Sequence, residues 1–105
     1  MSMNQINSAT FDTEVLGNDT FKIMFVGAPW CGHCQAMKPG VMEFSTENPD
    51  VSIFYADADE SPELMEKLEI RSIPTTFVFK DKKEVFRKVG ALTKNDLADL
   101  VTQYR

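Results

Sequence analysis

Two cysteines, Cys31 and Cys34, stand three residues apart, and the chain contains no others. Thiols at this spacing can close into a small disulfide ring and open again as a dithiol. An apolar stretch, residues 21–26, leads into the pair and predicts a central strand buried on both faces. A helical pattern over residues 31–47 leads out of it. The positions expected to share the buried face of that helix are Cys34, Met37, Val41 and Phe44.

The junction between strand and helix places the two thiols differently. Cys31 is expected at the helix N-terminus, where free N–H groups and a partial positive charge favour a thiolate. Cys34 lies one turn inside the helix and is expected to be a shielded, resolving thiol. Structural zinc sites use more ligands than one histidine and two cysteines provide. A purely structural disulfide would normally close a longer loop, so redox cycling is the favoured interpretation.

Length and composition limit the remaining possibilities. A chain of 105 residues suits one domain, spanning residues 1–105, with enough length to bury a core. The net charge of −5 argues against a nucleic-acid partner, which would need a basic face. The polar start of the chain shows no signal peptide, and no apolar stretch approaches membrane-spanning length. We therefore expect a cytoplasmic protein without membrane contact, although a chain that had lost a leader would show the same pattern.

Helical and strand patterns alternate along the rest of the chain. This alternation predicts an α/β fold with a sheet covered on both faces. Three acidic residues, Asp57, Asp59 and Glu60, do not continue into a calcium-loop pattern and predict a solvated loop. The expected elements are a short edge strand near Gln5-Ile6, a helix capped by Ser8 and running through Val15, a strand over 51–56, a short helix opened by Ser61-Pro62, a hairpin of strands 75–80 and 84–89 around the turn 81–83, and a last helix capped by Thr93 with Asp96.

Several motifs together resemble those of the thioredoxin family. They are Trp-Cys-Gly-x-Cys at 30–34 with a proline five residues after the second cysteine, the run 70–75, and the run 88–92. The resemblance implies the thioredoxin fold, a central mixed β-sheet flanked by helices on both faces. It also implies a thiol–disulfide oxidoreductase that reduces protein disulfides through a Cys31/Cys34 cycle. We expect no cofactor and no metal.

The resemblance also identifies residues that dock a substrate chain. It implies a cis peptide bond between Ile73 and Pro74, with the proline packed against the disulfide and backbone groups of Ile73 offered to a peptide. Trp30, Pro29, Ile73, Pro74 and Gly90 are expected to form an apolar rim around the cysteines. Trp30 could instead be a core residue, but an aromatic directly before the cysteine favours the rim.

The inner dipeptide, Gly32-His33, differs from the Gly-Pro of most thioredoxins and is typical of protein disulfide isomerase domains. As imidazolium, His33 would stabilise the Cys31 thiolate and make the protein a weaker reductant. Thioredoxins also carry a buried aspartate six residues before the first cysteine, and a lysine near it. Phe25 and Tyr55 occupy these positions here, which puts the usual proton relay in question.

Three functions follow from these observations. The first is a monomeric reductase that acts on disulfide-containing proteins and is recycled by a thioredoxin reductase or a glutathione-linked one. The second is a disulfide oxidase or isomerase, suggested by Gly32-His33. The third is a structural binding subunit whose thiols are dispensable. The first is the favoured hypothesis.

Overall fold

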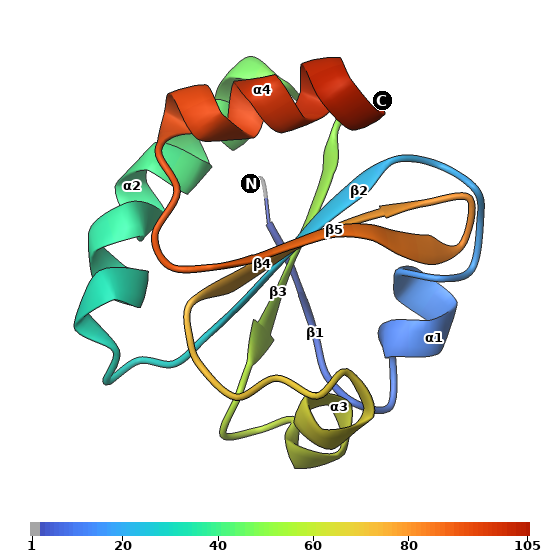
Figure 1. Cartoon of the computed structure of the whole chain (residues 1–105), viewed down its shortest axis with the longest axis vertical. Helices are drawn as coiled ribbons and strands as arrows, with labels where there is room; N and C mark the ends of the chain where they lie inside the picture. Colours follow the sequence, from blue (N-terminus) through green and yellow to red (C-terminus); the bar gives the residue numbers. More distant parts are fainter. Residues whose placement is uncertain (1–2) are drawn as a thin grey trace.

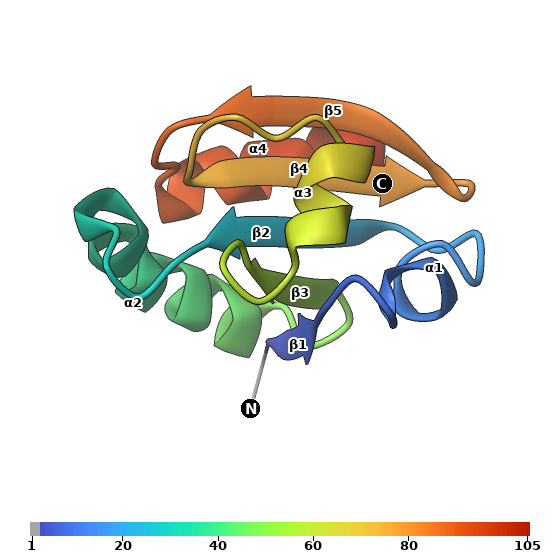
Figure 2. The same ribbon diagram turned by 90° about the horizontal axis from the view of Figure 1, so that it is seen from below.

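The computed structural model describes residues 3–105, and Met1 and Ser2 lie outside the described residues. A sheet with the strand order β1-β3-β2-β4-β5 forms its centre, and Figure 2 shows these strands side by side. β1, β3 and β2 run parallel, whereas β4 and β5 are antiparallel to their neighbours. The elements are β1 Asn4–Ile6, α1 Phe11–Glu14, β2 Lys22–Gly27, α2 Gly32–Glu47, β3 Ser52–Asp57, α3 Pro62–Lys67, β4 Thr75–Lys80, β5 Lys83–Val89 and α4 Lys94–Tyr104.

Helices cover both faces of the sheet, as the sequence predicted (Figure 1). One buried cluster packs α2 and α4 against the sheet and includes Phe44, Leu97 and Leu100. The other packs α1 and α3 against the opposite face and includes Phe11 and Leu64. Two separate apolar layers therefore hold the central sheet between them, which is the arrangement that an α/β fold requires.

β2 lies in the middle of this sheet, and all six of its residues are buried. Its near-continuous apolar sequence fits a strand covered on both faces. Even Lys22 is buried, and its Nζ donates hydrogen bonds to the carbonyl oxygens of Asn18 and Thr20 and to Asn18 Oδ1. Because β2 is rigidly held, the loop that follows it presents the cysteine motif at a defined place.

The first helix differs from its prediction. α1 begins at Phe11 after Thr10, and no side-chain hydrogen bond caps it. Ser8 does not cap this helix; its Oγ accepts a hydrogen bond from the N–H of Leu64 in α3, at 2.9 Å. Ser8 therefore accepts a hydrogen bond from the first turn of a helix 56 residues away, a contact that local sequence spacing does not reveal.

The hairpin also differs in its turn. β5 starts at Lys83, so the turn consists of Asp81 and Lys82, which have φ angles of 56° and 65°. Positive φ at both central positions is the geometry of the tight hairpin turn that usually selects Asn or Gly. The register is irregular between Val78 and Phe79, where a bulge interrupts the ladder. The predicted capping box of the last helix, Thr93 with Asp96, is confirmed.

No helix among residues 3–105 is long and apolar enough to cross a membrane.

Candidate active site

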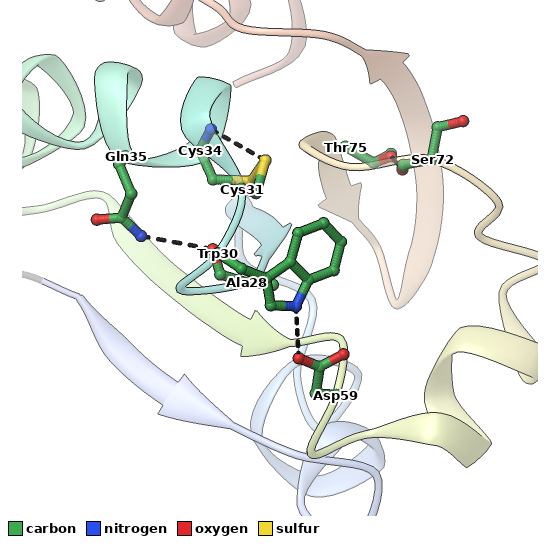
Figure 3. The surroundings of a disulfide bond; sticks show 8 residues. All are labelled: Ala28, Trp30, Cys31, Cys34, Gln35, Asp59, Ser72 and Thr75. Atoms are coloured by element: carbon green, nitrogen blue, oxygen red, sulfur yellow. Dashed lines mark hydrogen bonds between the residues drawn. A yellow bond between two sulfur atoms is a disulfide. The ribbon is translucent and has the colours of Figure 1, made fainter.

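The end of β2 and the start of α2 bring the two cysteines together. Cys31 is the N-cap residue of α2, in extended backbone conformation, and Cys34 lies in the first helical turn. Their side chains form a disulfide, with Cα atoms 5.2 Å apart. The Sγ of Cys31 also accepts a hydrogen bond from the backbone N–H of Cys34, at 3.2 Å (Figure 3). The motif therefore occupies the helix N-terminus, as predicted.

Burial does not distinguish the two cysteines in this oxidised state, because Cys31 is 7% and Cys34 9% exposed. Their neighbours do distinguish them. Cys31 Sγ receives a helix N–H, whereas Cys34 Sγ lies against the backbone of Gly27 at the end of β2. The positive end of the helix and this N–H favour negative charge on the sulfur of Cys31.

The side facing solvent carries an aromatic residue. Trp30 is 69% exposed, so it belongs to the surface and not to the core. Its indole N–H donates a hydrogen bond to Asp59 Oδ2, at 2.7 Å (Figure 3). Asp57 Oδ1 in turn accepts the backbone N–H of Asp59, at 2.8 Å, and Asp57 is buried. The prediction of a solvated acidic loop is therefore wrong for Asp57, which is buried, whereas Asp59 is exposed and also binds the Trp30 indole beside the disulfide.

A second segment closes the site from β4. The Ile73–Pro74 peptide bond is cis, which confirms the prediction. Ile73 is half-buried and packs against the small cluster of Ala28 and the two cysteines. Pro74 is buried, so it presents little of the rim surface that was predicted for it. Its carbonyl oxygen accepts the N–H of Gly90, at 2.8 Å.

Gly90 follows β5 and lies beside the site. Its φ angle is 111°, a value that residues other than glycine rarely adopt. The space where a Cβ would stand is open, with no atom within 4 Å. Its neighbour Val89 is 56% exposed and adds apolar surface. Pro29, at the opposite edge, is also exposed.

The residues between the cysteines face solvent. Gly32 and His33 are both exposed in the first turn of α2. A Cβ on Gly32 would meet no atom within 4 Å, so this glycine is not required by packing.

On the inner side of Cys34, facing away from solvent, the site contains a cavity. This cavity of about 40 Å³ lies between α2 and the sheet, and its wall includes Phe25, Gly27, Cys34, Lys38 and Tyr55. Burial, reinforced by the carboxylates of Asp57, Glu60 and Asp59, raises the pKa of Tyr55 above its usual value. The phenol therefore stays protonated at neutral pH.

Sequence reasoning missed two contributors, Gly27 and Asp59. A Cβ on Gly27 would lie 2.9 Å from Cys34 Sγ, so only glycine leaves room for the disulfide. A glycine between the apolar strand and the cysteine motif was the available signal. Asp59 gave none, because its partner Trp30 lies 29 residues away. Within residues 3–105, no three His, Cys, Asp or Glu side chains gather as a metal site would require.

Comparison with known proteins adds independent evidence. The sequence model of the family described as Thioredoxin matches residues 2–103. Thioredoxin from Pyropia yezoensis is 33% identical over 105 residues, which are 99% of this chain and 98% of that protein. Thioredoxin 1 from Synechococcus elongatus is 36% identical over 100 residues, which are 94% of each chain. The crystal structure of chloroplastic thioredoxin z has a TM-score of 0.87 at 24% identity, and the match covers 98% of this chain and 94% of that one.

A disulfide between the N-cap and the first turn of one helix closes a ring too small to brace a fold. Placed at an accessible end of a mixed sheet, it defines a thiol–disulfide oxidoreductase. The chain belongs to the thioredoxin family, because the family model spans nearly all of it and relatives of that name match it end to end. It is a protein-disulfide reductase, which acts on disulfide-containing proteins and draws its electrons from a reductase.

Proposed function

We propose that Cys31 is the nucleophile and Cys34 the resolving thiol of this reductase. The observation that supports this assignment is the position of Cys31 at the N-cap of α2, where the N–H of Cys34 points at its sulfur. A thiolate formed there on reduction gains a charge-assisted hydrogen bond and the favourable end of the helix dipole. Among residues 3–105 no hydrogen bond to Cys34 Sγ is found, and this sulfur lies against Gly27.

The reaction takes place in two exchanges. The Cys31 thiolate attacks one sulfur of a substrate disulfide, and the other substrate sulfur leaves as a thiolate that takes a proton from solvent. Cys34 then loses its proton and attacks Cys31 Sγ, so that the bond to the substrate breaks and the second substrate thiol is released. The substrate is reduced by two electrons and the Cys31–Cys34 pair is oxidised to the disulfide.

The substrate chain docks on the apolar rim around the disulfide. Trp30 and Pro29 form one edge of this rim, and Ile73 and Gly90 form the other. The open space at Gly90 admits a backbone, and the hydrogen bond from Gly90 to Pro74 holds the two segments at a fixed separation. Pro74 supports the rim from beneath, since it is buried. Gly32 and His33 tune the potential of the pair, because they occupy the exposed turn between its sulfurs.

Turnover of a protein disulfide, such as those of insulin, with a dithiol reductant as electron source tests this function. We expect catalysis by the wild-type protein and none by the Cys31→Ser/Cys34→Ser double variant. A double variant that retains full cellular function would instead identify a binding subunit whose thiols are dispensable.

We further propose that residues 1–105 act as one monomeric domain in the cytoplasm. A reductase needs a supply of electrons, which reducing compartments provide. Sedimentation of the purified protein tests the monomer, and imaging of a fluorescent fusion tests the location, with plastids as the alternative. Reduction of the purified disulfide by a thioredoxin reductase, compared with a glutathione-linked system, identifies the electron donor.

A further inference from the structure

The resolving step requires Cys34 to lose a proton in a buried place. Cys34 is only 9% exposed, and its sulfur lies against the end of β2. A thiol, unlike a thiolate, is a poor nucleophile, so the rate of this step depends on a group that can take the proton away. Of the residues that the structure describes, none in the cavity wall beside Cys34 carries a carboxylate, and Phe25 contributes only apolar atoms to it.

Tyr55 is a side chain in this wall that can exchange a proton, and its ring lies beside the sulfur. The point where a Gly27 Cβ would stand is 2.9 Å from Cys34 Sγ and 3.5 Å from Tyr55 Cε1. Cε1 is the ring carbon next to the one that bears the hydroxyl, so this edge of the ring lies beside the space that Cys34 Sγ occupies. The register of the sheet fixes this contact, because Tyr55 in β3 pairs with Phe25 in β2.

The cavity is large enough to complete the path. A water molecule needs about 10–15 Å³ of such volume and a few polar partners, and this cavity offers about 40 Å³. The exposed residues Gln35 and Lys38 also belong to its wall, which connects it to the surface of the protein. A proton that leaves Cys34 can therefore reach solvent beside Tyr55 without crossing the apolar core.

We propose that the Tyr55 hydroxyl relays the proton of Cys34 to solvent during the second exchange, an inference that rests on the proposed roles of the two cysteines. The hydroxyl accepts the thiol proton, directly or through a water in the cavity, and passes on its own proton. It has the same charge before and after the transfer. The electron pair left on Cys34 forms the new bond to Cys31 Sγ, and the substrate sulfur that is displaced takes a proton from solvent.

The charges around Tyr55 suit a relay that stays neutral. Asp57 on its own strand and Asp59 and Glu60 in the following loop raise its pKa, and burial does so more strongly. From β1, Gln5 pairs with Tyr55 and donates to Glu60, and from α2 the exposed Lys38 reaches the same cavity. A tyrosinate is therefore disfavoured, and the phenol acts as a hydroxyl and not as a standing base.

The test separates the two exchanges in time. Reduced protein is mixed with an aromatic disulfide that releases one coloured thiolate when Cys31 attacks and a second when Cys34 resolves the mixed disulfide. We expect Tyr55→Phe to leave the first phase unchanged and to slow the second by roughly 100-fold at neutral pH, the lower end for a positioned proton-transfer group. The difference in second-phase rate between Tyr55→Phe and the wild type should disappear as the pH rises, because Cys34 then ionises without a proton acceptor beside it.

Tyr104→Phe is the matched control, since it removes the other tyrosine hydroxyl, in α4, where the ring packs on Phe86. It should show both phases at wild-type rates. A normal first phase in Tyr55→Phe also shows that the variant is folded, so an equal second phase would overturn the relay while leaving the proposed function intact. A slow second phase in Lys38→Gln, with a normal one in Tyr55→Phe, would also overturn it. A wild-type protein without a first phase would refute the cysteine roles and the relay together.

Discussion

On the solvent side of the Cys31–Cys34 disulfide, Trp30 stands 69% exposed and the space at Gly90 is open. On the inner side, the glycine at position 27 leaves just enough room for Cys34 Sγ, and Tyr55 closes the back of the space. The exposed side contains the motif residues by which the thioredoxin family is recognised. The inner side contains Phe25 and Tyr55, where this chain departs from the family pattern.

We propose that the two sides perform separable tasks. In this proposal the exposed side docks a partner, and a Cβ on its glycines Gly32 and Gly90 would meet no atom within 4 Å. The inner side, in the same proposal, acts on the resolving thiol through packing and proton transfer. Substitutions on one side should therefore affect the first exchange, and substitutions on the other side should affect the second.

The cysteines themselves give the largest expected effect. Cys31→Ser should abolish reduction altogether, because the attacking thiolate is lost. Cys34→Ser should still attack but accumulate mixed disulfides with substrate proteins, which mass spectrometry under non-reducing conditions can count. Accumulation of mixed disulfides in Cys31→Ser instead would reverse the two roles and remove the distinction between the sides.

Gly27→Ala tests the inner side through stability. The added Cβ would lie 2.9 Å from Cys34 Sγ, and the disulfide prevents that sulfur from moving aside. Overpacking of this kind costs about 1–3 kcal/mol, to be measured by urea unfolding of the oxidised protein. Gly32→Ala is the control, because its Cβ meets no atom within 4 Å and should leave the unfolding free energy almost unchanged. Equal losses in both variants would show that the inner side is not specially constrained.

His33→Pro tests whether the exposed turn sets the redox potential. A hydrogen bond to a charged group contributes about 1.5–3 kcal/mol, and about 1.4 kcal/mol corresponds to about 30 mV for a two-electron couple. Loss of imidazole stabilisation of the Cys31 thiolate should therefore lower the potential by roughly 30–60 mV, measured by equilibration with glutathione. His33→Gln keeps a polar side chain that cannot become charged, and it separates charge from the effect of proline. An unchanged potential in both variants would assign the tuning to the helix or to the inner side.

Tyr55→Phe gives the smallest expected effect, a change in the unfolding free energy that is seen only at alkaline pH. Its pKa is raised in the folded protein, so its contribution is complete below the ordinary tyrosine pKa of about 10 and is lost as the pH rises through the folded pKa. Between about pH 9 and 11, the unfolding free energy of Tyr55→Phe should fall less steeply than that of the wild type. A Tyr104→Phe control should follow the wild type. Parallel curves for all three proteins would show that burial of the phenol carries no such linkage.

Much of the fold could be predicted because its signals are local. The apolar run 21–26 predicted a strand buried on both faces, and β2 is such a strand. The three-residue spacing of Thr93 and Asp96 predicted a capping box, which α4 has. The motif at 30–34 placed Cys31 at the start of a helix, and the structure agrees. Each of these features depends on residues within one or two turns of each other, so periodicity and capping preferences are sufficient.

Other features were decided only by tertiary structure. Ser8 belongs by its spacing to α1, yet it bonds to α3, because the packing of both helices on one sheet face brings the two together. Trp30 meets Asp59 because the parallel strands β2 and β3 end at the same edge of the sheet, each just before one of these residues. Tyr55 faces Cys34 because the register sets it opposite Phe25. A shift of one residue in a strand would turn each side chain to the other face, and the sequence within a strand does not specify the register of its neighbour. The cysteine motif at the start of α2 is therefore encoded in local sequence, whereas its contacts with Asp59 on the exposed side and with Tyr55 on the inner side exist only once the sheet has assembled.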